Sequence, residues 1–220
     1  MSGQINRGML IGDALTQLAT NRNFTTYVEV GTWNGQSSTK CLMDIIFQRA
    51  DMSRLYSLEA NIEFYEQATA YWAPVIKASD SIFKVEKLNL LYGRIIEKSE
   101  LITEEEVKNH PRFATRPWLE WRARNCAEYD VCENVCSQLP EIIDVLFLDG
   151  GQFSTRPEFS KLKGRVKVVA LDDTSTYKTE SIREEILKNT DHWTVVLDEP
   201  SERNGVFVAC KTEYLSLLKG

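Results

Sequence analysis

Short apolar runs alternate along the chain with longer segments in which apolar residues recur at helical spacing. This alternation predicts strands and helices that follow one another, which is typical of an α/β protein built around a mostly parallel sheet. A last pair of apolar runs, 193–197 and 206–211, flanks the turn-prone segment 200–205 and predicts two antiparallel strands. The earlier runs predict strands at 26–30, 54–58, 83–91, 142–148 and 166–171, and helices at 8–19, 37–50, 61–78, 157–162 and 180–189.

Residues 101–140 interrupt the alternation. Thr103 and Glu106 have the spacing of a capping box, which predicts the start of a helix, and Pro111 predicts where that helix ends. A chain of 220 residues fits one domain with a sizeable core. We therefore interpret residues 1–220 as a single domain that carries a helical insertion at about 101–140.

The composition is that of an ordinary soluble globular protein, with 43% hydrophobic and 26% charged residues. A formal net charge of −6 disfavours a surface dedicated to nucleic acid or to anionic membrane, because both require clustered Lys and Arg. No apolar run approaches the ~18 residues of a membrane span, and the opening residues lack the pattern of a secretory signal. We expect neither nucleic acid nor membrane among the partners.

Five cysteines, an odd number in a domain of this size, favour reduced thiols and a cytoplasmic location. Three of them, Cys126, Cys132 and Cys136, are close enough in sequence for a zinc site to be considered. Their spacing contains no CxxC pair, and neither histidine is near them in sequence. Buried or half-buried thiols are the better interpretation.

Acidic residues stand at or just after the ends of four of the predicted parallel strands. They are Glu29, Glu59, Asp149 and the pair Asp172 and Asp173. In an open parallel sheet, ligands bind outside the carboxyl ends of the strands. We therefore expect these acids to converge on one cleft.

The first strand runs into the sequence VEVGTWNGQSS at residues 28–38. Gly31 and Gly35 allow a tight turn and a close backbone approach, and the next helix would direct free N–H groups toward a ligand. Glycine is common in any loop between a strand and a helix, so the pair alone is a weak signal. Glu59, 24 residues after Gly35, has the position of an acid that binds ribose hydroxyls. The combination predicts a nucleoside-containing ligand.

A dinucleotide is a poorer match to this loop. Trp33 stands where the fingerprint GxGxxG has its middle glycine, and Glu29 would place a negative charge beside the phosphates. An acid-rich cleft suits a cationic ligand instead. S-adenosyl-L-methionine carries a sulfonium and an ammonium group, so it fits better than NAD, and an oxidoreductase is disfavoured.

Taken in order, the strand-end motifs resemble those of the class I S-adenosylmethionine-dependent methyltransferases. The family's first motif is matched by VEVGTWNGQSS, its second-strand motif by YSLEAN, and its later strand ends by LNLLYGRI, DVLFLDGG and VVALDDT. The resemblance extends over about residues 10–212, apart from the insertion. It implies a Rossmann-like, doubly wound α/β sheet that ends in a C-terminal antiparallel strand pair, and an S-adenosyl-L-methionine cofactor.

The resemblance also implies which residues form the cofactor site. Glu29 and Asp149 would face the methionine ammonium group, and Glu59 would accept the ribose hydroxyls. Gly93 and Arg94 would lie beside the adenine. The complete cofactor set is Glu29, Gly31, Trp33, Gly35, Ser37, Ser38, Glu59, Gly93, Arg94 and Asp149.

Two of these assignments have simple structural alternatives. Ser37 or Ser38 would lie near the methionine carboxylate, but capping of the following helix explains two serines equally well. Glu59 has the alternative of a solvated strand end.

A finer resemblance is to the metal-dependent sugar O-methyltransferases of the macrocin type. The matching segments are LDGGQFST and LDDT, and the implied metal ligands are Asp149, Asp172 and Asp173. Carboxylate oxygens are the ligands that Mg²⁺ prefers. The ion would hold two neighbouring hydroxyls of the acceptor and lower the pKa of the one that is methylated. The alternative is that the aspartate pair caps the turn that follows it.

This sequence departs from the macrocin pattern at one position. The family's general base lies two residues after the first metal ligand, and here that position is Gly151. Asp149 and Lys178 are the catalytic candidates that remain, and Tyr177 is a further candidate by position. A solvated surface lysine is the alternative for Lys178.

The insertion contains Trp118, Trp121, Arg122 and Arg124, which predict a lid over the acceptor or, equally, a helix packed onto the core. Together these features predict a methyltransferase that transfers a methyl group from S-adenosylmethionine to an oxygen of a small molecule such as a sugar. The alternative is a cofactor-binding scaffold without transfer activity, with Gly151 as the sign of the loss. The acceptor and the oligomeric state, a homodimer among the options, are left open.

Overall fold

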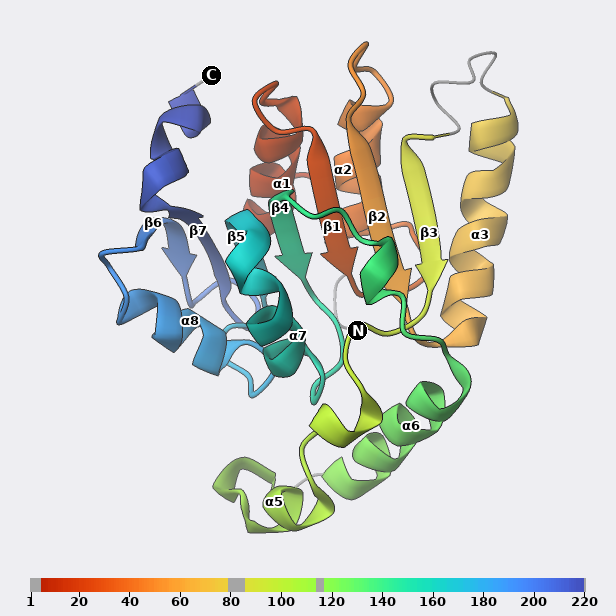
Figure 1. Cartoon of the computed structure of the whole chain (residues 1–220), viewed down its shortest axis with the longest axis vertical. Helices are drawn as coiled ribbons and strands as arrows, with labels where there is room; N and C mark the ends of the chain where they lie inside the picture. Colours follow the sequence, from red (N-terminus) through yellow and green to blue (C-terminus); the bar gives the residue numbers. More distant parts are fainter. Residues whose placement is uncertain (1–4, 79–85, 114–116, 220) are drawn as a thin grey trace.

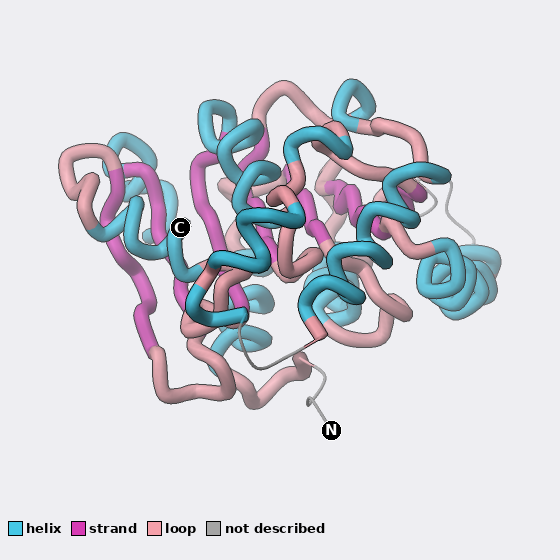
Figure 2. The backbone as a smooth tube through the Cα atoms, turned by 90° about the horizontal axis from the view of Figure 1, so that it is seen from below, coloured by secondary structure: helices cyan, strands magenta, loops and turns pink. Residues whose placement is uncertain are grey.

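A seven-stranded sheet runs through the centre of the molecule, with helices on both of its faces (Figure 1 and Figure 2). The computed structural model describes residues 5–78, 86–113 and 117–219. The strands are β1 Thr26–Val30, β2 Arg54–Glu59, β3 Leu88–Tyr92, β4 Ile143–Leu148, β5 Val166–Asp172, β6 Trp193–Glu199 and β7 Val206–Lys211.

The strand order across the sheet is β3-β2-β1-β4-β5-β7-β6. Strands β1 to β5 are parallel to one another, and β7 runs antiparallel to both β5 and β6. The Rossmann-like α/β sheet with a C-terminal antiparallel pair is therefore confirmed.

Helices connect the strands and form the insertion. Among the described residues, none of them combines the length and the hydrophobicity that a membrane-spanning segment requires. The α-helices are α1 Leu10–Thr20, α2 Ser38–Ile46, α3 Ile62–Lys77, α5 Glu104–Asn109, α6 Trp118–Val131, α7 Thr155–Leu162 and α8 Glu180–Leu187. The 3₁₀-helices are η1 Lys98–Glu100, η2 Pro111–Phe113, η3 Cys136–Gln138, η4 Lys163–Arg165 and η5 Thr212–Lys219.

Two helix boundaries differ from the prediction for local reasons. Helix α2 ends at Ile46 instead of residue 50, because the chain tightens into a turn in which the Arg49 N–H bonds the Ile46 carbonyl at 3.2 Å. Helix α7 begins at Thr155, before the predicted start at Pro157. Proline is tolerated there because the N–H groups of a first helical turn have no intrahelical partner.

Strand β3 begins later than predicted, at Leu88. Residues 86–87 form a turn, and residues 83–85 of the predicted strand lie outside the described residues. The end of β3, which bears on the site, lies one residue beyond the predicted end at residue 91.

Both faces of the central strands are buried, and alternate residues of these strands enter different cores. In β4, Leu146 and Leu148 pack with the apolar residues of α7 and α8, whereas Val145 and Phe147 pack with those of α1 and α2. The strand therefore reads as an uninterrupted apolar run, as expected for a parallel strand covered on both sides. This double burial fixes where the strands end and so positions the loops that follow them.

The insertion is helical and lies beyond the carboxyl ends of the parallel strands (Figure 1). Its predicted capping box is present: the Thr103 hydroxyl accepts the Glu106 N–H at 3.1 Å, and the Glu106 carboxylate accepts the Thr103 N–H at 2.7 Å. Helix α5 ends at Asn109, just before Pro111, as the sequence predicts.

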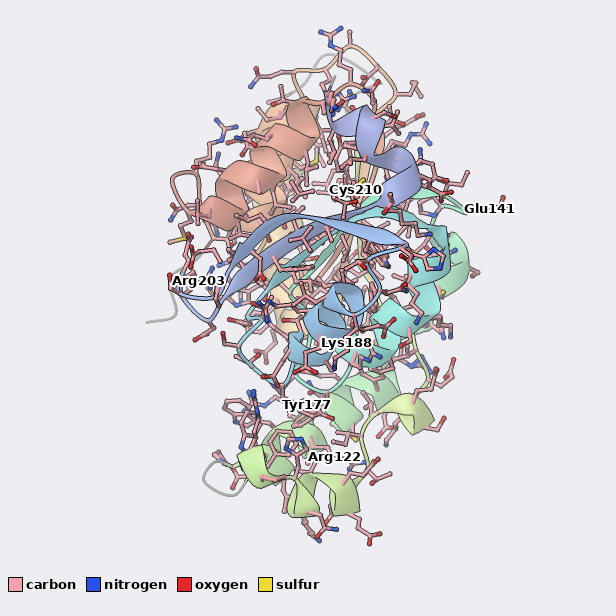
Figure 3. The ribbon with its side chains drawn as sticks, turned by 90° about the vertical axis from the view of Figure 1, so that its left-hand side faces the viewer. Arg122, Glu141, Tyr177, Lys188, Arg203 and Cys210 are labelled. Atoms are coloured by element: carbon pink, nitrogen blue, oxygen red, sulfur yellow. The ribbon has the colours of Figure 1, made fainter. Side chains whose placement is uncertain are left out.

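Four aromatic residues, here called the aromatic junction, attach the insertion to the sheet: Phe113, Trp118, Phe153 and Tyr177. The Phe113 ring centroid lies 4.7 Å from that of Trp118, 5.8 Å from that of Phe153 and 4.8 Å from that of Tyr177. Phe153 follows β4 and Tyr177 follows β5, and Figure 3 shows Tyr177 where the sheet body meets the insertion. Trp118 is buried in this junction, so it packs onto the core.

Candidate active site

A cavity of about 520 Å³ lies at the carboxyl edge, the edge of the sheet at which the parallel strands end. The loops after β1 to β5 and the β6–β7 loop line it, and α6 of the insertion forms one wall. Open α/β sheets bind their ligands at this edge. The charged residues of the wall are Glu59, Glu128, Asp149, Glu158 and Asp173 together with Arg94, Arg124, Lys178 and Arg203.

The glycine loop after β1 is pressed against the loop after β4. Gly31 has a φ of 100°, and a Cβ atom at this position would lie 2.4 Å from the main-chain carbonyl oxygen of Asp149. Only glycine suits both the conformation and the spacing. Gly35, with a φ of 74°, is enclosed differently, because a Cβ atom there would lie 2.8 Å from the indole nitrogen of Trp72. Gly31 borders the cavity, whereas Gly35 does not border it and packs against Trp72.

Trp33 and Ser37 of the same loop also border the cavity. Trp33 adopts a φ of 50°, a region that large side chains seldom enter, and its ring centroid lies 6.1 Å from that of Phe64. The Ser37 hydroxyl donates to the main-chain carbonyl of Ile5 at 3.2 Å. Ser38 does not border the cavity.

Glu29 lies beneath this loop and is fully buried. Its carboxylate accepts hydrogen bonds from the hydroxyls of Ser38 at 2.5 Å, Thr39 at 2.6 Å and Ser57. Burial raises the pKa of Glu29, and the three hydroxyl groups offset part of that rise. Glu29 thus ties the start of α2 to β1 and β2. The expected contact of Glu29 and Ser38 with a ligand is not what the geometry shows, because neither residue reaches the cavity wall.

Glu59, at the end of β2, lies in the cavity wall as the sequence predicts. Its Oε2 atom accepts the Trp33 N–H at 2.8 Å, and its Oε1 atom accepts the Asn61 N–H at 2.9 Å. Burial raises the pKa of Glu59 to about 7, although these N–H groups act to lower it. The carboxylate therefore joins the loop after β1 to the loop after β2 at the edge of the cavity.

The end of β3 brings Gly93 and Arg94 to the wall. A Cβ atom at Gly93 would lie 2.6 Å from the Val135 side chain, so the segment after α6 packs directly on this position. The Arg94 guanidinium pairs with Glu97 at 2.9 Å and donates to the Cys132 carbonyl at 3.2 Å. Both predicted residues contact the segment that follows α6 in the insertion.

Asp149, Asp172 and Asp173 converge as the sequence predicts, with one carboxylate oxygen from each within 4.8 Å of the others. The ammonium of Lys178 lies among them, paired with Asp149 and, at 2.6 Å, with Asp173. Arg203 pairs with Asp172 at 3.2 Å. Asp172 is fully buried below the wall, and the other four residues line the cavity.

The electrostatics of this cluster limit what Lys178 can do. Burial lowers the pKa of Lys178, but Asp149 and Asp173 raise it more, so the net shift is upward. The residue therefore stays protonated at neutral pH and has no lone pair with which to accept a proton. Burial, Asp149 and Asp173 together raise the pKa of Asp172 to about 7. Lys178 is a fixed cation and a hydrogen-bond donor, which disfavours its use as a general base.

Sequence reasoning missed Glu158, in the first turn of α7. It is 3% exposed, borders the cavity, and accepts the Tyr129 hydroxyl through Oε1 at 3.0 Å. Within the described residues, its Oε2 atom and the Nε2 atom of Gln152 are buried without a hydrogen-bond partner. Burial raises the pKa of Glu158 to about 7. No motif marks this residue; its one sequence signal is an acid placed shortly after a strand that ends in Asp149.

The insertion contributes part of the wall, but not with all the residues expected. Trp121 and Arg124 border the cavity. The Arg122 guanidinium instead donates to the main-chain carbonyl of Ile102 within the insertion at 2.5 Å. Helix α6 adds Asn125 and Glu128, which the sequence analysis did not single out.

The cysteines form no comparable cluster. All five are free thiols. In the part of the chain that the structure describes, the group of side chains able to share a metal ion is the aspartate cluster, which contains none of them.

Comparison with known proteins bears on the fold. No protein-family model matches the sequence, and no curated protein matches it. Solved structures match over nearly the whole chain. An O-methyltransferase from Bacillus cereus, in complex with SAH, has a TM-score of 0.59 at 13% identity and covers 96% of this chain and 84% of its own. The fold is that of the class I methyltransferases.

Two further structures show how widely this fold is used. The O-methyltransferase TomG from Streptomyces achromogenes, involved in tomaymycin synthesis and in complex with SAM, has a TM-score of 0.52 at 16% identity, covering 91% of this chain and 79% of its own. An rRNA methylase from Streptococcus thermophilus has a TM-score of 0.52 at 12% identity, covering 95% of this chain and 99% of its own. Proteins with very different acceptors share the fold, so the acceptor has to be argued from the site.

Proposed function

We propose that this chain is an S-adenosylmethionine-dependent methyltransferase that methylates an oxygen of a small molecule, such as a sugar. The observation that carries the proposal is the position of Glu59 at the end of β2, in the wall of a cavity that Gly31 and Asp149 also border. An acid at this strand end, next to a glycine loop, is how wound sheets bind the ribose of a nucleoside. The free thiols support the predicted cytoplasmic location.

The residues present fit the cofactor. Gly31 leaves room for a ligand to pass along the backbone, and Glu59 offers carboxylate oxygens to the ribose hydroxyls. The unpartnered Oε2 of Glu158 and Nε2 of Gln152 place one acceptor and one donor in the same wall. An adenine edge offers the complementary donor and acceptor, so these two side chains extend the predicted adenine site beyond Gly93 and Arg94.

In the reaction, the chain positions the cofactor and the acceptor and excludes water. When bound, S-adenosylmethionine supplies an electrophilic methyl group. Asp149 and Lys178 border the end of the cavity next to the cofactor loop, where they can hold an acceptor hydroxyl by hydrogen bonds. Trp121 and Arg124 wall the cavity from α6 and reduce its contact with solvent. Orientation and desolvation of this kind are large contributors to the rates of displacement reactions.

A cofactor-binding scaffold without transfer activity is the second candidate. Gly151 favours it, because the carboxylate that serves as general base in the macrocin type is missing there. The ammonium of Lys178 cannot replace that base while it remains protonated. Asp149 is the carboxylate of the wall that is best placed to accept the proton, although it also carries the ion pair with Lys178.

Two measurements test the proposal. In calorimetric titrations, we expect S-adenosylmethionine and S-adenosylhomocysteine to bind with one site per chain and NAD not to bind. Incubation with methyl-labelled cofactor and a panel of sugars and catechols should then transfer label to at least one acceptor, and Asp149→Asn should abolish the transfer. Binding of NAD but not of S-adenosylhomocysteine would refute the methyltransferase assignment. Tight cofactor binding without label transfer would favour the scaffold.

A further inference from the structure

The aspartate cluster has the composition of a magnesium site but contains a cation of its own. The Lys178 ammonium contacts Asp149 and Asp173, two of the three carboxylates that would have to ligate the metal. Its side chain is only 8% exposed. The position between the carboxylates, where an ion would bind, is therefore taken by a side chain of the protein.

Most of the negative charge of the cluster is also offset without an ion. Three carboxylates carry at most three negative charges, and Lys178 and Arg203 supply two positive charges, which is the charge of one divalent cation. Arg203 pairs with Asp172, the aspartate that Lys178 does not reach, at 3.2 Å. A divalent ion added to this arrangement would lie next to an ammonium and a guanidinium, and their repulsion opposes its binding.

The backbone is anchored on both sides of Lys178. On one side, Tyr177 belongs to the aromatic junction. On the other, the Thr179 hydroxyl donates to the main-chain carbonyl of Asp172 at 2.7 Å. The turn is closed by a hydrogen bond from the Thr176 N–H to the Asp173 carbonyl at 2.9 Å. Because the backbone is anchored, the Lys178 side chain can leave the cluster to admit an ion only by breaking its two ion pairs.

We propose that Lys178, with Arg203, takes the place of the divalent cation of related sites, so that this cavity works without a metal. The ammonium holds Asp149 and Asp173 together as a metal ion would. Two of its three N–H donors meet these aspartates, and the third is available to an acceptor oxygen in the cavity that the side chain borders. The proposal deepens the proposed methyltransferase function, but it makes a prediction about cation binding that does not require methyl transfer.

Binding of Mn²⁺ tests the proposal, measured by calorimetry and by the loss of the free-ion electron paramagnetic resonance signal. Three proteins are compared: the wild type, Lys178→Met, and Lys163→Met as the matched control. Lys163 also pairs with a carboxylate, Glu185 at 2.7 Å, but it does not border the cavity. We expect no stoichiometric Mn²⁺ binding to the wild type or to the control. Lys178→Met should bind one Mn²⁺ per chain, and its melting temperature should rise with Mn²⁺ because the ion binds only the folded state.

Adding Asp172→Asn to Lys178→Met should abolish the acquired site. The proposal is overturned if the wild type binds one Mn²⁺ that Asp172→Asn removes, and also if folded Lys178→Met binds none. Circular dichroism establishes folding, and Lys178→Gln serves if the methionine variant does not fold. Titration of the wild type with S-adenosylhomocysteine runs in parallel. Normal binding there with an adverse metal result rejects only this inference, whereas absence of binding rejects the proposed function.

Discussion

The two ends of the parallel strands differ in how completely their buried polar side chains are paired. At the amino edge, where β1 to β4 begin, the buried Lys87 donates to three main-chain carbonyls at distances between 2.8 and 3.1 Å. Asp144 accepts two main-chain N–H groups and pairs with Lys167 at 2.7 Å. Arg49 pairs with Asp51 at 2.6 Å and donates to two more carbonyls. Each of these charged side chains has hydrogen-bond or ion-pair partners within the protein.

At the carboxyl edge the protein leaves polar groups unmatched. Among the described residues, buried side-chain atoms of Glu158 and Gln152 in the cavity wall lack a hydrogen-bond partner. The described non-glycine residues with positive φ also border the cavity, and they are Trp33, Asp173 and Arg203. Backbone strain of this kind costs about 1–3 kcal/mol at each residue and gathers at functional sites.

This difference between the two edges indicates that the amino edge serves mainly stability and the carboxyl edge mainly function. Removing one partner of a fully paired buried charge destabilises the fold, whereas an unpartnered buried polar group reduces stability until a ligand provides the partner. The amino edge therefore anchors the fold, and the carboxyl edge is arranged for binding. Substitutions at the two edges should have different consequences.

The largest effect on stability is expected from Lys87→Met. The change removes the Lys87 donor from three main-chain carbonyls, of which that of Ile46 keeps the Arg49 N–H, so the free energy of unfolding should fall by about 3 kcal/mol. The affinity for S-adenosylhomocysteine should not change, because Lys87 lies at the opposite edge from the cavity. Urea denaturation measures the first quantity and calorimetry the second, with the exposed Lys188→Met as the control. A loss of affinity in folded Lys87→Met would contradict the separation of the two edges.

Glu59→Ala should show the reverse pattern. Loss of the carboxylate should reduce the affinity for S-adenosylhomocysteine about 100-fold, which corresponds to about 2.7 kcal/mol. Stability at pH 8 should not fall, because the variant no longer buries a carboxylate whose pKa is raised to about 7. The matched control is Glu66→Ala, an exposed glutamate on α3. Unchanged affinity in Glu59→Ala would exclude Glu59 as the ribose-binding acid.

A third prediction concerns pH and Glu158. Burial raises the pKa of this acid from 4.5 to about 7, so the folded state binds its proton more tightly than the unfolded state. The stabilisation is full below pH 4.5 and is lost as the pH rises through 7. Over this range the free energy of unfolding of the wild type should fall by an amount on the order of 2 kcal/mol, and Glu158→Gln should not show this fall. Urea denaturation of the wild type and the variant from pH 4.5 to 8 tests this prediction. If the free energy of unfolding depends on pH in the same way in both proteins, the prediction is wrong.

The smallest effect is expected from Asp51→Asn at the amino edge, and its pH dependence has the opposite sign. Although burial raises the pKa of Asp51, the hydrogen bonds from Arg49 and Ser53 lower it to about 2. Its stabilisation is present above pH 3.8 and is lost as the pH falls toward 2. Because the side chain is 35% exposed, we expect only about 1 kcal/mol. Thermal melts between pH 2 and 6 should show a flatter profile for the variant.

The sequence predicted the sheet and the gathering of acids at its carboxyl edge, because both follow from local patterns. Strand alternation also indicates which way Glu29 points, since Val28 and Val30 enter one core and Tyr27 enters the other. Glu29 shares the face of Tyr27 and so turns toward α2. The motif resemblance led instead to the prediction that Glu29 contacts a ligand. The alternation of side chains along the strand agrees better with the position of Glu29 in the structure.

Other parts of the site could not be predicted, because they depend on how distant segments meet. Lys178 reaches Asp149 only because the chain turns at Asp173, which has a φ of 61°. The wall formed by Glu128 and Tyr129 depends on where the aromatic junction fixes α6. No spacing rule within one segment encodes either arrangement.

The positions of two tryptophan side chains allow ligand binding to be followed by the protein's own fluorescence. Trp33 and Trp121 border the cavity, and the ring centroid of Trp121 lies 5.0 Å from that of Trp118 in the aromatic junction. A molecule entering the cavity changes the polarity around both wall tryptophans and displaces solvent from them. Emission from the unlabelled chain can therefore follow occupancy in real time, and replacing each ring in turn with phenylalanine would show which of the two reports the binding.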